Sequence, residues 1–262
     1  MAEIIAIANQ KGGVGKTTST LSLGAAFQEM GHKVLLVDLD PQGSLTVSMG
    51  YLQPDDLDRT IYDVLRQIVD EGKLSTIKTL PILTNNEGLD LIPSNIELAG
   101  IDSVLAGDPA GGNTVLKAAL HSAQDAYDFI LLDCPPHLGI VSINALTAAN
   151  RVVIPMAAEY LSMKGLSSLT RTIMQIQMRS NPGLTVGGIF HTMADTRTVH
   201  ARDVIEITHS DLSENYAVYQ TVIPRNVSVT EAPVAGQSIL TYNSNSPAAA
   251  SYRALAKEIG HG

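Results

Sequence analysis

The sequence predicts an α/β fold in which a mostly parallel, twisted sheet carries helices on both of its faces. Short apolar runs alternate with segments of helical period along the chain, a pattern typical of βαβ units. Hydrophobic residues make up 45% of the 262 residues and charged residues 16%, which is enough apolar surface for one large packed core. We therefore expect a single domain over residues 1–262.

The predicted strands are short apolar runs, and the predicted helices carry apolar residues at helical spacing. The helix at 60–71, for example, places Ile61, Val64, Leu65, Ile68 and Val69 on one stripe. The strongly polar stretch 53–87 is predicted to be an insertion or helical excursion after the second strand. Strands are expected at 3–9, 33–38, 89–94, 128–133, 151–156, 184–192 and 221–225, and helices at 16–30, 60–71, 139–149, 163–179, 199–208 and 248–259.

Composition excludes several classes of protein. The single cysteine, Cys134, excludes an internal disulfide framework and an iron–sulfur cluster held by several thiolates of one chain. We find no signal peptide and no apolar run long enough for a membrane span, so we expect a cytoplasmic protein without membrane contact. A formal net charge of −9 argues against a surface that is basic all over, although a local basic patch stays open.

A glycine-rich loop, within NQKGGVGKTT, lies between the first strand and the first helix. Backbone N–H groups and the positive end of a helix dipole meet there, which makes an anion site of the P-loop NTPase type. Lys16 is expected to reach the β and γ phosphates and the Thr17 hydroxyl to ligate Mg²⁺. Gln10 stands where the strict pattern has glycine, so the match is to a variant form; the alternative is a chance glycine-rich turn. The expected phosphate cradle is Gly12, Gly13, Val14, Gly15, Lys16, Thr17 and Thr18.

Three aspartates follow two other predicted strands. Asp38 and Asp40 lie in LVDLDPQG and Asp133 ends DFILLD, and parallel strands place their ligand crevice at these carboxyl ends. We expect Asp38 and Asp133 near the metal, and Asp40, already in the loop, near the water that attacks the γ phosphate. The alternative for Asp38 and Asp40 is an acidic surface turn. Cys134 is expected to be a small buried residue and not a nucleophile.

With KGGVGKTT, DLDPQG and DCPP in this order, the chain resembles the ParA/Soj branch of the deviant Walker A ATPases, relatives of MinD. The segments AEYLSMKGLSSL, TMADTRT and TVIPRNVSVTEAP extend the resemblance nearly from end to end. The resemblance implies ATP and Mg²⁺ as cofactors. It also implies an ATPase that is weak until a partner stimulates it.

The same resemblance implies roles for individual residues. Lys11 corresponds to the signature lysine, which in this family crosses an ATP-sandwich homodimer and touches the phosphates bound by the partner subunit. A lysine donated in this way would neutralise the phosphates that face each other across a two-fold axis. Pro224 and Asn226 are expected against the adenine, with Met193 helping to enclose the base.

The family resemblance further implies a dimerisation clock that partitions or positions a plasmid, a chromosome or a protein assembly. Its partner would be a ParB-like protein or cargo adaptor with a basic amino-terminal segment, attracted to this acidic chain. Relatives bind DNA nonspecifically, but here Ser228 and Gln237 stand where basic residues are frequent, which weakens the expected contact with the nucleoid. The candidates for a basic patch are Arg171, Arg197, Arg202, Arg225 and Arg253.

Two other functions compete with this interpretation. A MinD-like membrane switch would need an amphipathic, basic tail, whereas SYRALAKEIGHG offers only Arg253 and Lys257 and is predicted to dock on the core. A redox or metabolic relative is the second alternative, and Cys134 alone cannot supply the ligands of its cluster-bearing form.

Overall fold

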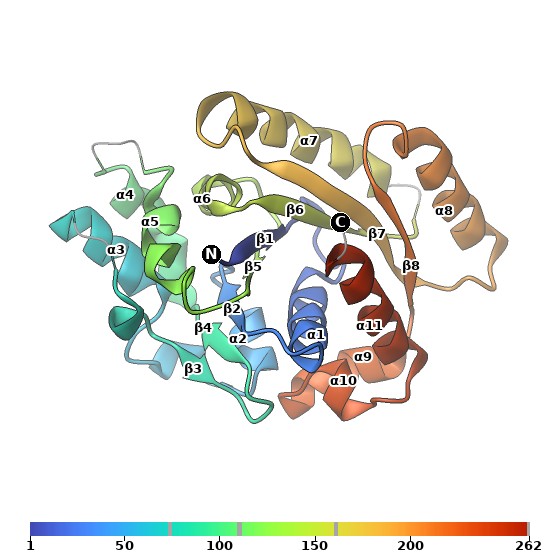
Figure 1. Ribbon diagram of the computed structural model, residues 1–262, viewed down its shortest axis with the longest axis horizontal. Coiled ribbons are helices and arrows are strands. Elements are labelled where there is room, and N and C mark those ends of the chain that lie inside the picture. Colours follow the sequence, from blue (N-terminus) through green and yellow to red (C-terminus); the bar gives the residue numbers. More distant parts are fainter. Residues whose placement is uncertain (73–74, 109–111, 160–161, 261–262) are drawn as a thin grey trace.

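A computed structural model describes residues 1–72, 75–108, 112–159 and 162–260. Its strands form one eight-stranded sheet in the order β3-β4-β2-β5-β1-β6-β7-β8, which runs through the centre of the molecule (Figure 1). The strands are β1 Glu3–Ile7, β2 Val34–Asp38, β3 Leu83–Thr84, β4 Asp90–Ile92, β5 Phe129–Asp133, β6 Arg151–Ala157, β7 Thr185–Ala194 and β8 Val218–Pro224.

The pairing of the strands confirms the predicted fold class. Every neighbouring pair is parallel except β3 and β4, which are antiparallel at the edge of the sheet. All seven predicted strands are present, with boundaries shifted by up to three residues. The sequence interpretation missed β3, because two residues of edge strand carry no periodic signal. The assignment of residues 1–262 to one domain stays a prediction.

Helices cover both faces of the sheet, as predicted. Alternate residues of each central strand point to opposite faces, so Ile4 packs with one core cluster and Ile5 with the other. One cluster holds residues of α3 to α7, and the other holds residues of α1, α2, α10 and α11. The helices are α1 Lys16–Glu29, α2 Ser44–Ser48, α3 Ile61–Glu71, α4 Ile101–Leu105, α5 Val115–Leu120, α6 Ile140–Ala148, α7 Ser162–Arg179, α8 Val199–Leu212, α9 Val227–Glu231, α10 Ile239–Tyr242 and α11 Pro247–Gly260.

Helix α3 begins and ends on local signals that are visible in the sequence. The Thr60 hydroxyl accepts a hydrogen bond from the Tyr62 N–H at 3.3 Å, and the Asp63 carboxylate accepts one from the Thr60 N–H at 2.8 Å. These contacts form a capping box, and Gly72 ends the helix with a φ of 63°. In the described part of the stretch 53–87, α3 is thus a helix that follows the second strand, and β3 adds an edge strand to the sheet.

Helix α11 docks on the core as predicted. Ala249, Tyr252 and Leu255 are buried, and the helix packs against α1 and β8, lying beside α1 in Figure 1. Its apolar face is thus covered by the rest of the chain. Within the described ranges, no helix combines the length and the apolar character needed to cross a bilayer.

Candidate functional site

The carboxyl ends of three neighbouring strands meet at one edge of the sheet. In the parallel register, Asp133 of β5 pairs with Ile7 at the end of β1 and with Asp38 at the end of β2. The glycine-rich loop leaves β1 at this edge and enters α1 at Lys16. The structure therefore brings the phosphate loop and the two strand-end aspartates together, as the sequence pattern predicts.

The backbone of the phosphate loop needs glycine at two positions. Gly13 has a φ of 71° and Gly15 a φ of 80°, a left-handed conformation that a side chain disfavours. Between them, the buried Val14 carbonyl accepts a hydrogen bond from the Thr192 hydroxyl at 2.9 Å. At the start of the loop, the Asn9 side-chain oxygen accepts a hydrogen bond from the Lys11 N–H at 2.9 Å. Asn9, which follows β1, and Thr192 of β7 thus hold the loop from outside.

The Lys16 ammonium group lies inside the loop. Its side chain is 7% exposed, and Nζ donates a hydrogen bond to the Lys11 carbonyl at 3.3 Å. Burial lowers the pKa of Lys16, while the nearby Asp133 and Asp40 carboxylates act in the opposite direction. An ammonium group at the start of α1, within a glycine-rich loop, suits a polyphosphate.

Asp133 has the features of a metal ligand or of a residue that holds a metal-bound water. It is almost fully buried, its Oδ1 accepts a hydrogen bond from the Thr20 hydroxyl at 3.4 Å, and Oδ2 has no hydrogen-bond donor among the described residues. Burial raises the pKa of Asp133 and repulsion by Asp38 raises it further, whereas the Thr17 hydroxyl and Lys16 lower it. An orphaned buried oxygen beside the Thr17 hydroxyl fits Mg²⁺, which prefers oxygen ligands.

Asp38 differs from Asp133 because donors already contact both of its oxygens. Oδ2 accepts hydrogen bonds from the N–H and the hydroxyl of Thr46, each at 2.8 Å, and Oδ1 accepts one from the Asp40 N–H at 3.1 Å. Burial raises the pKa of Asp38 to about 6, against the effect of these bonds. Asp38 therefore orients α2 and the loop that carries Asp40, and its role as a metal ligand stays a prediction.

Two cavities adjoin the loop. One of about 430 Å³ is lined by the phosphate loop, Asp40, and Ser44 and Ser48 of α2. The other, of about 370 Å³, is lined by residues from the ends of β7 and β8 and from α9. The predicted adenine residues Met193, Pro224 and Asn226 all line this second cavity. Met193 lines both cavities, and its φ of 52° is the only positive value of a non-glycine residue in the described part of the chain.

The comparisons with known proteins agree with this geometry. A family model described as an AAA domain matches residues 2–186. Soj of Bacillus subtilis (strain 168), the sporulation initiation inhibitor protein, is 44% identical over 260 residues, which cover 99% of this chain and 98% of that protein. The chromosome-partitioning ATPase Soj of Treponema pallidum (strain Nichols) is 41% identical over 262 residues, with 99% and 97% covered. The chain belongs to the ParA/Soj family of the ParA/MinD superfamily.

A solved structure supports the fold of this ParA/Soj family member. The structure of cobyrinic acid a,c-diamide synthase from Mycobacterium smegmatis, with bound ATP analogue and magnesium, matches with a TM-score of 0.80 and 37% identity. The match covers 98% of this chain and 93% of that one. The fold is thus that of a P-loop ATPase.

The two lysines of the ParA/Soj loop point to different places. Whereas Nζ of Lys16 lies within the loop, Nζ of Lys11 lies outside it and contacts the Glu159 carboxylate at 2.7 Å. The Lys11 side chain is 34% exposed. The same motif therefore supplies one ammonium group to the interior and one to the surface.

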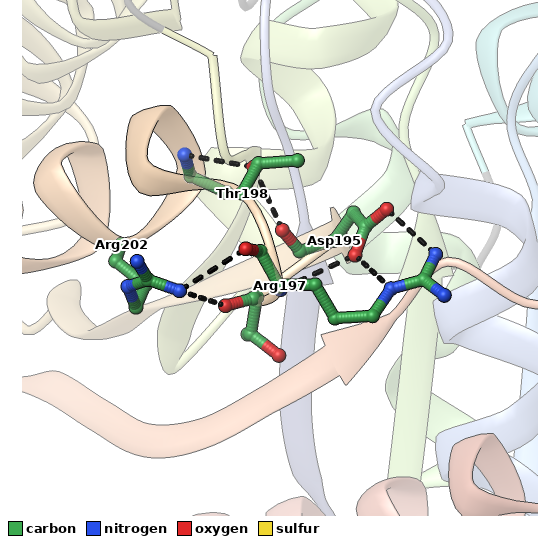
Figure 2. A network of polar contacts seen from close by, with 6 residues as sticks. Asp195, Arg197, Thr198 and Arg202 are labelled. Carbon is green, nitrogen blue, oxygen red and sulfur yellow. Dashed lines mark hydrogen bonds and ion pairs between the residues drawn. The ribbon is translucent and has the colours of Figure 1, made fainter.

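Three of the five candidate arginines of this ParA/Soj chain hold its own loops together. Arg197 forms two hydrogen bonds of 2.8 Å with the Asp195 carboxylate, and Arg202 donates to the Thr196 and Arg197 carbonyls at 3.0 and 3.1 Å (Figure 2). Arg253 pairs with Glu29 at 2.6 Å. Asp195 and Arg197 are thus partners within the chain.

Sequence reasoning missed several residues of the site. Thr192 supports the phosphate loop, Glu159 contacts Lys11, and the buried Tyr252 lines the second cavity while bonding the Ser19 hydroxyl at 3.1 Å. Thr192 lies near the carboxyl end of β7. Because ligands bind at the carboxyl ends of parallel strands, this position could have indicated it. Nothing local marks Glu159 or Tyr252, because both reach the site only through the tertiary fold.

Proposed function

We propose that this chain is an ATPase that dimerises on ATP and uses the cycle to partition or position a large intracellular cargo. As a ParA/MinD superfamily member it is a partition or positioning ATPase. The reaction is slow until a ParB-like protein or cargo adaptor stimulates it. The cargo would be a plasmid, a chromosome or a protein assembly.

ATP and Mg²⁺ are the cofactors. The loop from Gly12 to Thr18 would hold the phosphates, and Thr17 with Asp133 would hold the metal. When bound, Mg²⁺ neutralises charge on the β and γ phosphate oxygens. The 370 Å³ cavity would take the base, with Pro224 and Asn226 beside it and Met193 between base and phosphates.

The reaction transfers the γ phosphoryl group to water and yields ADP and phosphate. Asp40 is half-buried, lines the phosphate-side cavity, and has its Oδ1 held by the Gln42 N–H at 3.0 Å. From this place it would orient the attacking water, while Lys16 stabilises the charge that develops on the phosphates.

The single observation that carries dimerisation is the position of Lys11. Its ammonium group lies outside the loop that Lys16 already serves, on a partly exposed side chain, which favours contact with a nucleotide on a second copy of the chain. Two copies placed face to face would each lend this charge to the partner's phosphates. Such an arrangement makes the interface depend on the nucleotide.

Light scattering on the purified chain with a non-hydrolysable ATP analogue and Mg²⁺ tests this proposal. We expect a dimer with the analogue and a monomer without nucleotide. Lys16→Ala should lose nucleotide binding, whereas Lys11→Ala should bind nucleotide and dimerise poorly. A nucleotide-loaded wild-type chain that stays monomeric at all concentrations would contradict the proposal.

Charge and packing support the choice of partners. The net charge of −9 favours an adaptor with a basic amino-terminal segment. DNA contact would be nonspecific and weak, because Ser228 and Gln237 replace frequent basic residues and three candidate arginines are engaged within the chain. We propose a cytoplasmic location without membrane contact, since α11 buries its apolar face against the core.

A further inference from the structure

One ion pair links the phosphate loop to the segment that follows β6. Nζ of Lys11 donates a hydrogen bond to Oε2 of Glu159 at 2.7 Å, between residues 148 positions apart in the chain. The Glu159 side chain is 64% exposed, so no burial of the carboxylate forces this contact. Attraction between two opposite charges on partly exposed side chains therefore holds the pair.

Glu159 lies near several basic side chains. The hydrogen bond from Lys11 is the main reason that the pKa of Glu159 is lowered, and His200 and Arg225 contribute from other elements. Glu159 and Arg225 also line the 370 Å³ cavity beside the phosphate loop. The carboxylate therefore lies where the charge balance changes when a nucleotide arrives.

The contact conflicts with the place that Lys11 must take in a nucleotide-bridged dimer. The ammonium group has three N–H donors, so the conflict is one of reach: the direction that brings Nζ to 2.7 Å from Glu159 of its own chain is taken to differ from the one needed to touch the phosphates of the partner. We propose that Glu159 is a positioning residue that holds Lys11 in the monomer and must give it up when two nucleotide-loaded copies associate. This inference rests on the proposed function, because it assumes that Lys11 crosses the interface.

Electrostatics favours the transfer of the Lys11 ammonium group from Glu159 to the phosphates bound by the partner. A triphosphate carries more negative charge than one carboxylate, so the partner's nucleotide can compete for the ammonium group. Arg225 and His200 stay beside Glu159 after Lys11 leaves, and its exposure lets water solvate it. The pair thus opposes association without nucleotide and yields when nucleotide is bound on the partner.

The test compares dimerisation of Glu159→Gln with that of the wild-type chain. Gln keeps the size of the side chain and removes its charge, so Lys11 no longer has to leave an ion pair. With the non-hydrolysable ATP analogue and Mg²⁺, we expect the dimer dissociation constant to fall by about two- to fivefold, the range of exposed ion pairs. The difference should shrink between about 50 mM and about 300 mM salt, since salt screens exposed charges.

Three controls separate this effect from a general loss of negative charge. Glu214→Gln removes an exposed charge between α8 and the amino end of β8, whereas Glu159 follows the carboxyl end of β6, and it should leave the constant unchanged. In a Lys11→Ala background, Glu159→Gln should no longer tighten the dimer. Glu159→Asp keeps the charge with a shorter reach and should fall between wild type and Gln.

The outcomes distinguish this inference from the function on which it rests. If Glu159→Gln dimerises no better than wild type, or more weakly, while Lys11→Ala still weakens the dimer, then Glu159 does not restrain Lys11. The same conclusion follows if Glu159→Gln tightens the dimer equally in the Lys11→Ala background. If the wild-type chain forms no nucleotide-dependent dimer at all, the proposed function itself is wrong and the inference falls with it.

Discussion

At the scale of single residues, identical side chains acquire different chemistry from their surroundings. Lys16 is buried within the loop, whereas Lys11, five positions earlier, ends at the surface beside Glu159. Among the described residues, one buried oxygen of Asp133 has no donor, whereas Asp38 accepts three hydrogen bonds. The environment of each group, and not its residue type, therefore decides which of them suit a phosphate or a metal.

Replacement of Asp40 by alanine should separate binding from hydrolysis. The side chain lines the phosphate-side cavity without belonging to the loop itself, so Asp40→Ala should still bind ATP and dimerise. We expect the hydrolysis rate to fall by about 100-fold, the lower range for a lost proton-transfer or water-orienting group. Single-turnover hydrolysis and nucleotide titration measure the two properties, and a loss of nucleotide affinity would show that its role is misplaced.

The buried His191 should make the protein sensitive to acid. His191 lies on β7, and neither ring nitrogen has a well-aligned hydrogen bond among the described residues; burial lowers its pKa from 6.5 to about 4, against a weaker opposing effect of the Met156 backbone. The folded chain thus binds this proton less well than the unfolded chain. The contribution is fully present above pH 6.5 and is lost as the pH falls from 6.5 towards 4.

Chemical denaturation of wild type and His191→Asn at two pH values measures this effect. Between pH 7.5 and pH 5, the free energy of unfolding should fall by about 2 kcal/mol more in wild type than in the variant. Equal losses in the two proteins would mean that another group dominates. The comparison between the two proteins cancels the titration of groups such as Asp38.

At the scale of elements, the ends of helices and strands do most of the positioning. Helix α1 begins at a glycine in a left-handed conformation, which leaves its first N–H groups without a side-chain cap. Those N–H groups face the loop that would hold the phosphates. Helix α3, away from the loop, has instead a complete capping box. The first N–H groups of α1 are thus left for a ligand to accept from, whereas those of α3 are bonded by side chains of the chain itself.

Loss of the α3 cap should therefore destabilise the fold without disturbing the site. Thr60→Ala removes the hydroxyl that accepts the Tyr62 N–H, and we expect the free energy of unfolding to fall by about 1 kcal/mol. ATP affinity should stay within experimental error, because Thr60 lines neither cavity beside the loop. Denaturant titration and nucleotide binding check the two statements, and a large loss of affinity would reveal coupling between α3 and the loop.

At the scale of the whole molecule, the charge distribution limits the partners. From residue 195 onward the chain has five Lys or Arg against seven Asp or Glu. Several of these arginines are engaged within the chain, as Figure 2 illustrates for Arg197 and Arg202. A phosphate backbone would meet few uncompensated cations on this third of the protein.

Restoring the missing charges should strengthen DNA binding in a way that depends on salt. We expect the double variant Ser228→Arg/Gln237→Lys, loaded with the ATP analogue, to bind nonspecific duplex DNA more tightly than wild type. Each added phosphate contact should steepen the slope of log affinity against log salt by about 0.9. Titration at several salt concentrations measures the slope, and an unchanged slope would place the DNA contact elsewhere.

Much of the fold and the centre of the site follow from local patterns. The phosphate loop, the strand-end aspartates and the longer helices each carry a signal within about a dozen residues. The short helices α2, α4, α5, α9 and α10 and the edge strand β3 were missed, because segments this short show too few apolar positions for a period. Pro224 and Asn226 were placed by family resemblance alone, and the structure puts both on the second cavity.

By itself, the sequence determined that a strand, a glycine loop and a helix would make an anion site, because that geometry depends on neighbouring residues. Only the tertiary structure decided which distant side chains complete the site. Thr192, Glu159 and Tyr252 come from β7, from the segment after β6 and from α11, and they meet the loop through the parallel register of the sheet and the docking of the last helix. Contacts between residues more than 140 positions apart depend on packing of the whole chain, which no local pattern contains.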